Sequence, residues 1–363
     1  MNGNRVLWIV IALVVALLAA AAVYRTVANQ SREADAGERV EIVLRFVSTR
    51  AREKGADKDN PAEALGGERG PTSTGHCRVS SIPIPITEAL AKRANFYVPT
   101  RDRDITAVDP FAAEAFWEEL ESTAAADPDK PIVLFVHGYF YGFERVCLRG
   151  AGLQQALGDR GHLVMFTWPS DGNPAGYVSD QADVEWSVPQ LADVIRELEQ
   201  RFGPERIRLV AHSLGTRGML YALERILLEG GSGPFASQLV LLAPDFDAGT
   251  FLANLPLVDP VVGDITVYAS DNDRPLEISE ELHGQPRLGQ GGENRTVAQG
   301  FETVDVSNLG RYQYSGHEYF HYHPVASADL VQLLVSGERA ADRPHTVPHA
   351  LGELTYWTLS EPD

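Results

Sequence analysis

The stretch Ala-His-Ser-Leu-Gly at residues 211–215 contains the residue types most able to do covalent chemistry in this sequence. It follows an apolar run at 206–210 and precedes a helix-like segment at 216–228, so we expect a strand, a sharp turn and a helix around Ser213. Such a turn strains the serine backbone and needs small residues two positions before and after it. The glycine meets this need fully, and the alanine meets it with a methyl group. The pattern predicts an exposed nucleophilic serine; the alternative is a helix N-cap serine.

A serine hydroxyl is a weak nucleophile at neutral pH and needs a histidine base that a carboxylate orients. After a turn of this kind the acid and then the histidine follow in chain order, each on a loop after a later strand. For the acid we favour Asp273, with Asp245 as the alternative. Asp247 and Asp271 are further candidates, and Asp247 is also placed to cap a helix near Ala248.

His317 is our candidate for the base, because it lies on a glycine-bearing loop after the last strand-like run, 301–306. A ring on such a loop can swing over the serine. His321 and His323 are held in reserve, just before a helix-like segment. The remaining candidates are His283, His345 and His349. The closely spaced His317, His321 and His323 could also be metal ligands. No carboxylate or cysteine pattern lies near them, so we predict no metal and no cofactor.

Two backbone amides are needed where negative charge develops on the substrate oxygen. The N–H of Leu214, at a helix N-terminus, is expected to supply one of them. The N–H of Tyr139, after the apolar run 132–136, is expected to supply the other. His137 precedes the serine and is interpreted as structural. Aromatic residues that either line an apolar pocket or pack in the core are Tyr139, Phe140, Tyr141, Phe143 and Trp168.

Short β-branched runs alternate with helix-like stretches through the second half of the chain. The runs lie at 132–136, 163–167, 207–210, 239–242 and 265–269. This alternation is typical of an α/β fold, a mostly parallel, doubly wound sheet with helices on both faces. The candidate residues follow the strands of this sheet, so we expect them to lie together at its carboxyl edge.

The residues before this region are less regular. Strands are expected at 41–47 and 77–86, and a charge-rich surface loop at 50–75. A helix at 111–120 is expected to open after the pair Asp109-Pro110.

The first 28 residues contain a second strong signal. Residues 6–23 carry no charge and as a helix would span about 27 Å, close to the hydrocarbon core of a bilayer. We favour an N-terminal transmembrane anchor over a cleaved signal peptide, because the apolar run is longer than a usual signal core. The globular domain is then expected to face the periplasm or outside, or to be secreted if the segment is cleaved.

The remaining organisation follows from these boundaries. Residues 29–40 are expected to be a spacer, 41–335 a single α/β domain, and 336–363 a C-terminal tail whose clearest element is 354–359. The two cysteines, Cys77 and Cys147, either form one disulfide or stay as buried thiols. With 363 residues, 44% hydrophobic residues and a net charge of −19, the chain is a folded protein without a nucleic-acid-binding face.

Taken together, these stretches resemble the α/β-hydrolase superfamily, and more narrowly a bacterial branch of it known only as a domain of unknown function. The residues that carry the resemblance are Phe135-Val136-His137-Gly138-Tyr139, Phe166-Thr167-Trp168-Pro169-Ser170-Asp171-Gly172, residues 211–215, Ala243-Pro244-Asp245-Phe246-Asp247, Tyr268-Ala269-Ser270-Asp271-Asn272-Asp273 and Gly316-His317. It covers about residues 45–335. The resemblance implies the α/β-hydrolase fold, with Ser213, Asp273 and His317 as nucleophile, acid and base. Alanine at 211 departs from the glycine usual in the superfamily.

The sequence therefore predicts a membrane-anchored serine esterase or lipase-like enzyme acting on a small-molecule or lipid-like ester. The same residues could pass the acyl group to an alcohol or amine, which would make the protein an acyltransferase. A non-catalytic envelope protein that uses the hydrolase fold for binding or scaffolding is the alternative from another class.

Overall fold

The computed structural model describes residues 39–53, 60–84, 97 and 99–360. The chain divides into a smaller unit, residues 1–41 and 80–104, and a larger unit, residues 42–79 and 105–363. In the smaller unit, Nε of Arg101 donates to the Ser81 hydroxyl at 2.7 Å. The larger unit contains every candidate site residue.

Eleven strands of the described residues form one sheet, in the order β10-β11-β9-β8-β7-β6-β4-β5-β1-β2-β3. Their bounds are β1 (Val40–Arg52), β2 (Leu65–Pro83), β3 (Arg101–Phe111), β4 (Ile132–Val136), β5 (His162–Thr167), β6 (Ile207–His212), β7 (Ala236–Leu242), β8 (Val262–Ala269), β9 (Glu302–Asp305), β10 (Thr346–Leu351) and β11 (Leu354–Leu359). Every neighbouring pair from β11 to β1 is parallel, whereas β10 and β11 are antiparallel.

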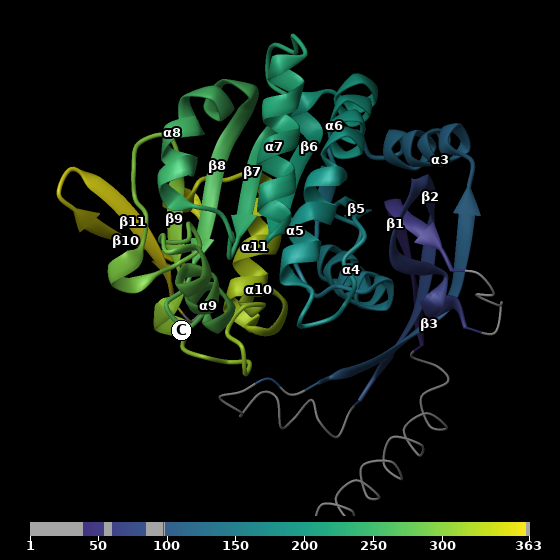
Figure 1. Cartoon of the computed structure of the whole chain (residues 1–363), viewed down its shortest axis with the longest axis horizontal. Coiled ribbons are helices and arrows are strands. Elements are labelled where there is room, and N and C mark those ends of the chain that lie inside the picture. The colour runs from purple at the N-terminus through teal and green to yellow at the C-terminus, as the bar shows by residue number, and fades with distance from the viewer. Residues whose placement is uncertain (1–38, 54–59, 85–96, 98, 361–363) are drawn as a thin grey trace, which may run out of the picture. The chain divides into compact units, whose positions relative to one another are not determined.

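Helices cover both faces of this sheet. They are α3 (Ala113–Ala125), α4 (Phe143–Leu157), α5 (Tyr177–Trp186), α6 (Val188–Phe202), α7 (Gly215–Leu228), α8 (Ala248–Val258), α9 (Arg274–His283), α10 (Tyr319–Tyr322) and α11 (Pro324–Ser336). Apolar side chains of α3, α6, α7 and α8 pack on one face, and those of α4 and α11 on the other. In Figure 1, α7 and α8 lie on the near side of the strands and α11 on the far side.

The register of the central strands explains why both faces are apolar. Leu134 pairs with Leu209, Leu209 with Leu239, and Leu239 with Ile265, and all four side chains are buried on the face under α6 and α7. The residues between them point to the opposite face, because side chains alternate along a strand. The predicted mostly parallel, doubly wound sheet is confirmed, and β4 has the predicted bounds.

Two expectations before β4 were wrong. The segment predicted as a surface loop, 50–75, contributes to β1 and β2, because the Arg50 guanidinium is buried and its hydrogen-bond donors are satisfied inside the domain. The pair Asp109-Pro110 ends β3 rather than starting a helix. Asp109 is held on the strand by an ion pair with Arg78 (2.6 Å), and α3 begins at Ala113.

The C-terminal residues also differ from expectation. The element expected at 354–359 is the strand β11, but β10 precedes it and both belong to the sheet. Arg343 forms a buried ion pair with Asp329 of α11 (2.8 Å), and the Tyr268 hydroxyl donates to the same carboxylate at 2.5 Å. These polar contacts join the last residues to the domain, and a search for apolar periodicity does not detect them.

A disulfide joins Cys77 of β2 to Cys147 of α4, so the second of the two alternatives, buried thiols, is excluded. The predicted membrane segment at 6–23 lies outside the described residues. Within those residues, none of the helices has the length and apolar character that crossing a membrane requires.

Candidate active site

Residues with strained backbone conformations lie together at the carboxyl edge of the sheet. Among the described residues, Phe140, Ser213 and Ala243 are the non-glycine residues with positive φ, at 64°, 53° and 44°. They follow the ends of β4, β6 and β7, which are neighbours in the sheet. Each such conformation costs about 1–3 kcal/mol and persists only when its surroundings enforce it. The chain therefore holds three strained residues at one place.

Ser213 lies on the turn between β6 and α7, as predicted, but the predicted exposure of the serine is wrong, because only 4% of the residue is exposed. Its N–H donates to the Leu242 carbonyl at 3.0 Å, and its own carbonyl accepts from the Asp245 N–H at 3.2 Å. A Cβ at Gly215 would lie 2.4 Å from the His137 carbonyl oxygen, and one at Gly138 would lie 2.7 Å from the Ser213 Cβ. Both glycines are needed because the strands approach so closely, and the turn is locked from both sides.

The loops after β8 and β9 bring Asp273 and His317 together. Nδ1 of His317 lies 2.7 and 2.9 Å from the two carboxylate oxygens of Asp273. Asp273 also caps α9 by accepting from the Leu276 N–H at 3.1 Å, and only 1% of the residue is exposed. This contact fixes the histidine ring by one nitrogen and leaves Nε2 as the nitrogen that can exchange a proton with a hydroxyl.

The His317 ring stands beside the nucleophile turn. Its centroid lies 4.7 Å from that of His212, the residue before Ser213. Burial disfavours the charged ring, but the Asp273 carboxylate outweighs this effect and raises the pKa of His317 above the usual histidine value. His212 is fully buried, and burial lowers its pKa well below that value. The rings of His317 and His212 thus have opposite protonation tendencies: the pKa of His317 is raised and that of His212 is lowered.

Two backbone amides near Ser213 are candidates for an oxyanion site. Leu214 is the N-cap of α7, and neither its N–H nor that of Tyr139 has an acceptor within the described part of the chain. The next two amides of the same loop are occupied: Phe140 donates to Asp180 at 3.3 Å and Tyr141 to the Ser170 hydroxyl at 3.0 Å. The amides chosen from the sequence are therefore unoccupied ones.

A buried layer beneath this loop holds it in place. The His137 ring stacks between Tyr141 and Trp168, with centroid distances of 5.5 and 4.9 Å. Trp168 Nε1 donates to the His137 carbonyl at 2.8 Å, and Arg50 donates to the Tyr141 carbonyl at 2.6 Å. Burial lowers the pKa of His137 well below its usual value. These contacts agree with a structural role for His137.

Of the aromatic residues considered for a pocket, Tyr141, Phe143 and Trp168 are buried in the core. Tyr139 is partly exposed and Phe140 is 37% exposed, so these two remain at the surface of the site.

Asp245, the alternative acid, has a full set of other partners. It forms a buried ion pair with Arg287 (2.9 Å) and accepts from the hydroxyls of Ser279 (2.5 Å) and Tyr177 (2.6 Å). Its carboxylate thus joins α5 and α9 beside the nucleophile. The acid that meets the His317 ring is Asp273.

The remaining candidates lie in local structure. Asp247 caps α8 by accepting from the Thr250 N–H at 2.6 Å, as predicted, and His323 caps α11. His283 ends α9, and its Nδ1 lies 2.8 Å from the Ser279 carbonyl. The Asp271 side chain is exposed, the His321 ring lies 4.4 Å from the Phe320 ring at a tilt of 41°, and His349 lies in β10. No described group of three or more His, Cys, Asp or Glu side chains is arranged to hold a metal.

Three buried charged residues of the site were not predicted. They are Arg50, Asp180, whose carboxylate accepts from Ser170, and Glu318, which follows His317 directly. Glu318 was detectable only as the neighbour of the base, because nothing in a sequence separates a buried glutamate from a solvated one.

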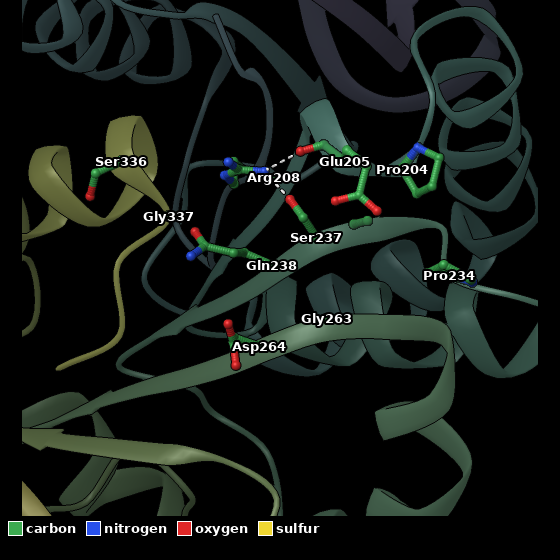
Figure 2. A pocket seen from close by; sticks show the side chains of 11 residues that line it. Pro204, Glu205, Arg208, Pro234, Ser237, Gln238, Gly263, Asp264, Ser336 and Gly337 are labelled. Atoms are coloured by element: carbon green, nitrogen blue, oxygen red, sulfur yellow. Dashed lines mark hydrogen bonds between the residues drawn. The ribbon is translucent and has the colours of Figure 1, made fainter. Parts of the chain in front are cut away.

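A hollow lies at the opposite edge of the sheet (Figure 2). It has a volume of about 500 Å³ and is lined where β6, β7 and β8 begin, by Arg208, Ser237, Gln238 and Asp264 among others. Ser213 follows the other end of β6, so this hollow is separate from the candidate site.

Residues 112–336 match the model of a family described as "Alpha/beta hydrolase of unknown function (DUF900)". This match covers more than half of the chain. The chain belongs to this family. The resemblance to the α/β-hydrolase superfamily is thereby confirmed, and membership supports hydrolase chemistry while leaving the substrate open.

More specific likenesses of this α/β hydrolase are weak. An uncharacterised protein of Nostoc sp., alr1448, is 32% identical over 65 residues, which cover 18% of this chain and only 17% of that protein. The metagenomic carboxylesterase EstE1 is 14% identical over 88% of this chain and 96% of its own, with a TM-score of 0.33. The RedJ thioesterase of Streptomyces coelicolor is 16% identical over 58% and 88%, with a TM-score of 0.34. The carboxylesterase and thioesterase activities are those of EstE1 and RedJ and are not assigned to this chain.

Proposed function

We propose that this α/β hydrolase is a serine esterase that cleaves carboxylic esters through Ser213, His317 and Asp273. The observation that carries the proposal is the contact between the Asp273 carboxylate and Nδ1 of His317, beside a serine held at φ 53°. The raised pKa of His317 supports it, because a base must take up a proton as the serine attacks. The unoccupied amides of Tyr139 and Leu214 support it from the side of the developing charge.

The reaction would proceed in two half-reactions. Ser213 Oγ attacks the ester carbonyl carbon while Nε2 of His317 takes its proton, and the two amides stabilise the resulting oxyanion. The tetrahedral intermediate collapses, the bond to the alcohol oxygen breaks, and the imidazolium protonates the departing alcohol. Water, activated by the same histidine, then attacks the acyl-serine and releases the acid. The residues need no metal or organic cofactor for these steps.

The test is labelling of the full-length protein by a fluorophosphonate, with Ser213→Ala as the control. Attack by Ser213 forms an O–P bond and expels fluoride, so an activated serine is labelled stoichiometrically. Labelling of the wild type alone would support the proposal. Absence of labelling in a folded protein would overturn it and leave the non-catalytic envelope protein as the better reading.

Acetyl, butyryl and palmitoyl esters of p-nitrophenol would then define whether the substrate is a short ester or a lipid-like one. Adding a primary alcohol to the assay separates hydrolysis from acyl transfer. An acyltransferase gives the new ester as the main product, whereas an esterase gives the free acid.

We also propose that residues 1–28 anchor the domain in a membrane, with the domain on the periplasmic or outer side. The support is the uncharged run at 6–23 between Arg5 and Arg25. Membrane fractions that keep the protein after alkaline washing, with an intact N-terminus and protease access from outside, are the expected result. A processed N-terminus and release to the soluble fraction would indicate a cleaved signal peptide.

A further inference from the structure

Glu318 is a buried carboxylate next to the candidate base. Only 2% of the residue is exposed, and it is the N-cap residue of the short helix α10. Its backbone carbonyl accepts from the His321 N–H at 2.9 Å. The side chain is therefore turned away from solvent, although helix N-termini usually present acidic side chains to water.

The partners of this carboxylate come from the loop after β4 and from α4. The Tyr141 hydroxyl donates to Glu318, and Arg145 Nη2 donates to its other oxygen at 2.7 Å. Nε of Arg149 lies 3.4 Å from Glu318 as an ion pair. Arg145 also lies 4.4 Å from the Tyr141 ring centroid and donates to the Phe140 carbonyl at 3.3 Å. One carboxylate thus contacts Tyr141, which follows Phe140 (φ 64°), and also binds Arg145, which donates to the Phe140 carbonyl.

From these contacts we infer that Glu318 is a positioning residue, which clamps the loop carrying His317 to the loop carrying the Tyr139 amide. The inference rests on the proposed function, since it assigns the clamp to the base and the oxyanion site of that reaction. It adds a residue that has no contact of its own with the substrate and acts through its neighbours in both loops.

The charge of Glu318 matters as well as its geometry. Burial disfavours the ionised carboxylate, but Arg149 and Arg145 outweigh burial and hold the pKa of Glu318 well below its usual range. The ionised group, together with Asp273 and Asp245, raises the pKa of His317, while His212 stands against the same ring. The other groups facing Glu318 are Tyr141 and His321. Loss of its negative charge should therefore lower the pKa of His317.

The decisive variant is Glu318→Gln in the full-length protein, with Glu119→Gln as the matched control. Glu119 is also an ionised glutamate paired with an arginine, Arg45 (2.7 Å), but it joins α3 to β1. The pKa of His317 is measured by NMR on histidine-labelled protein, with the resonance assigned by its loss in His317→Gln. The rate of fluorophosphonate labelling is measured against pH on the same samples.

We expect Glu318→Gln to lower the pKa of His317 by about one unit and the plateau labelling rate roughly tenfold to hundredfold, with Glu119→Gln like the wild type. Glu318→Asp should leave the pKa of His317 unchanged but slow labelling, because the shorter side chain loses its hydrogen bond with the Tyr141 hydroxyl. If Glu318→Gln fails to fold, Tyr141→Phe removes one contact without changing any charge, and should slow labelling at an unchanged pKa.

An unchanged His317 pKa together with unchanged labelling in folded Glu318→Gln would overturn the inference. If Glu318→Gln fails to fold, a labelling rate in Tyr141→Phe equal to that of the wild type would overturn the inference instead. Failure of the proposed function looks different: the wild type itself is then unlabelled, and the NMR titration still reports whether Glu318 tunes His317.

Discussion

The two edges of the sheet differ in how their carboxylates are held. At the carboxyl edge, Asp273, Asp245 and Glu318 each have several hydrogen-bond or ion-pair partners. At the amino edge, Asp264 is partly exposed and pairs with Arg339 at 3.0 Å. Buried polar atoms without a partner among the described residues occur at both edges, such as Arg208 Nε at the amino edge and His212 Nδ1 at the carboxyl edge. The amino edge borders a hollow of about 500 Å³, yet its carboxylate is held by fewer contacts.

Backbone strain differs in the same direction. The positive-φ residues Phe140, Ser213 and Ala243 all follow the carboxyl ends of strands. Strain of this kind is stable only where many contacts over-determine the backbone, as the buried carboxylates do here. The candidate site therefore lies where buried carboxylates are fixed by several partners, and not at the hollow of Figure 2. Four substitutions or titrations test this difference.

The largest effect is expected for Asp273→Asn. The amide cannot stabilise a charged His317, and it favours the wrong tautomer of the ring, so labelling of Ser213 should slow by about 10³–10⁴-fold. Asp264→Asn is the matched change at the amino edge, where Asp264 pairs with Arg339 at 3.0 Å in a partly exposed position. It should leave the rate within about twofold. Equal losses in the two variants would contradict the comparison.

The next effect is one of stability, for Asp245→Asn. The substitution leaves the buried Arg287 charge unpaired, which typically costs about 3–5 kcal/mol of unfolding free energy. Urea denaturation of the full-length protein measures it. The neighbouring Asp247→Asn keeps a good N-cap residue and should change the free energy by less than about 0.5 kcal/mol. A small loss for Asp245→Asn would mean that Asp245 is not an essential tie between α5 and α9.

The sequence predicts the parts of this molecule that obey local rules. The central strands are short β-branched runs, and the order of Ser213, Asp273 and His317 along the chain limits the search to a few loops; the structure brings Asp273 and His317 into contact. Their catalytic roles remain a prediction. The clamp at Glu318 was missed because its partners, Tyr141 and Arg145, are more than 170 residues away in sequence.

The same reasoning explains the errors in the fold. The charge-rich composition of residues 50–75 predicts a solvated loop. The buried Arg50 guanidinium nevertheless donates hydrogen bonds to groups from three other segments. Arg343 escaped detection for a similar reason, since its ion pair with Asp329 joins the residues before β10 to α11. Long-range polar contacts have no periodicity, so no window along the chain reveals them.

The third prediction concerns pH. His317 must be neutral to accept a proton, and its pKa is raised, so labelling should increase as pH rises through a value above that of an ordinary histidine. In Asp273→Asn the counter-charge is gone, the pKa should fall, and the residual acid limb should move to lower pH. Rates measured between about pH 5 and 9 test this, because that range covers the titration of an ordinary histidine and of one whose pKa is raised. An acid limb at or below the usual histidine value in the wild type would contradict the assigned base.

The smallest effect is expected at the amino edge, for Arg208→Met. Burial lowers the pKa of Arg208, and its Nε lacks an acceptor, so replacing the guanidinium removes a desolvation cost along with its bonds to Glu205 and Ser237. These terms oppose each other, and the unfolding free energy should change by about 1 kcal/mol or less. Arg287→Met is the matched arginine at the carboxyl edge and should cost several times more, because it strands the Asp245 carboxylate. If Arg208→Met instead slowed labelling tenfold at unchanged stability, the two edges would be coupled through the strands that join them. The hollow in Figure 2 would then influence the reactivity of Ser213.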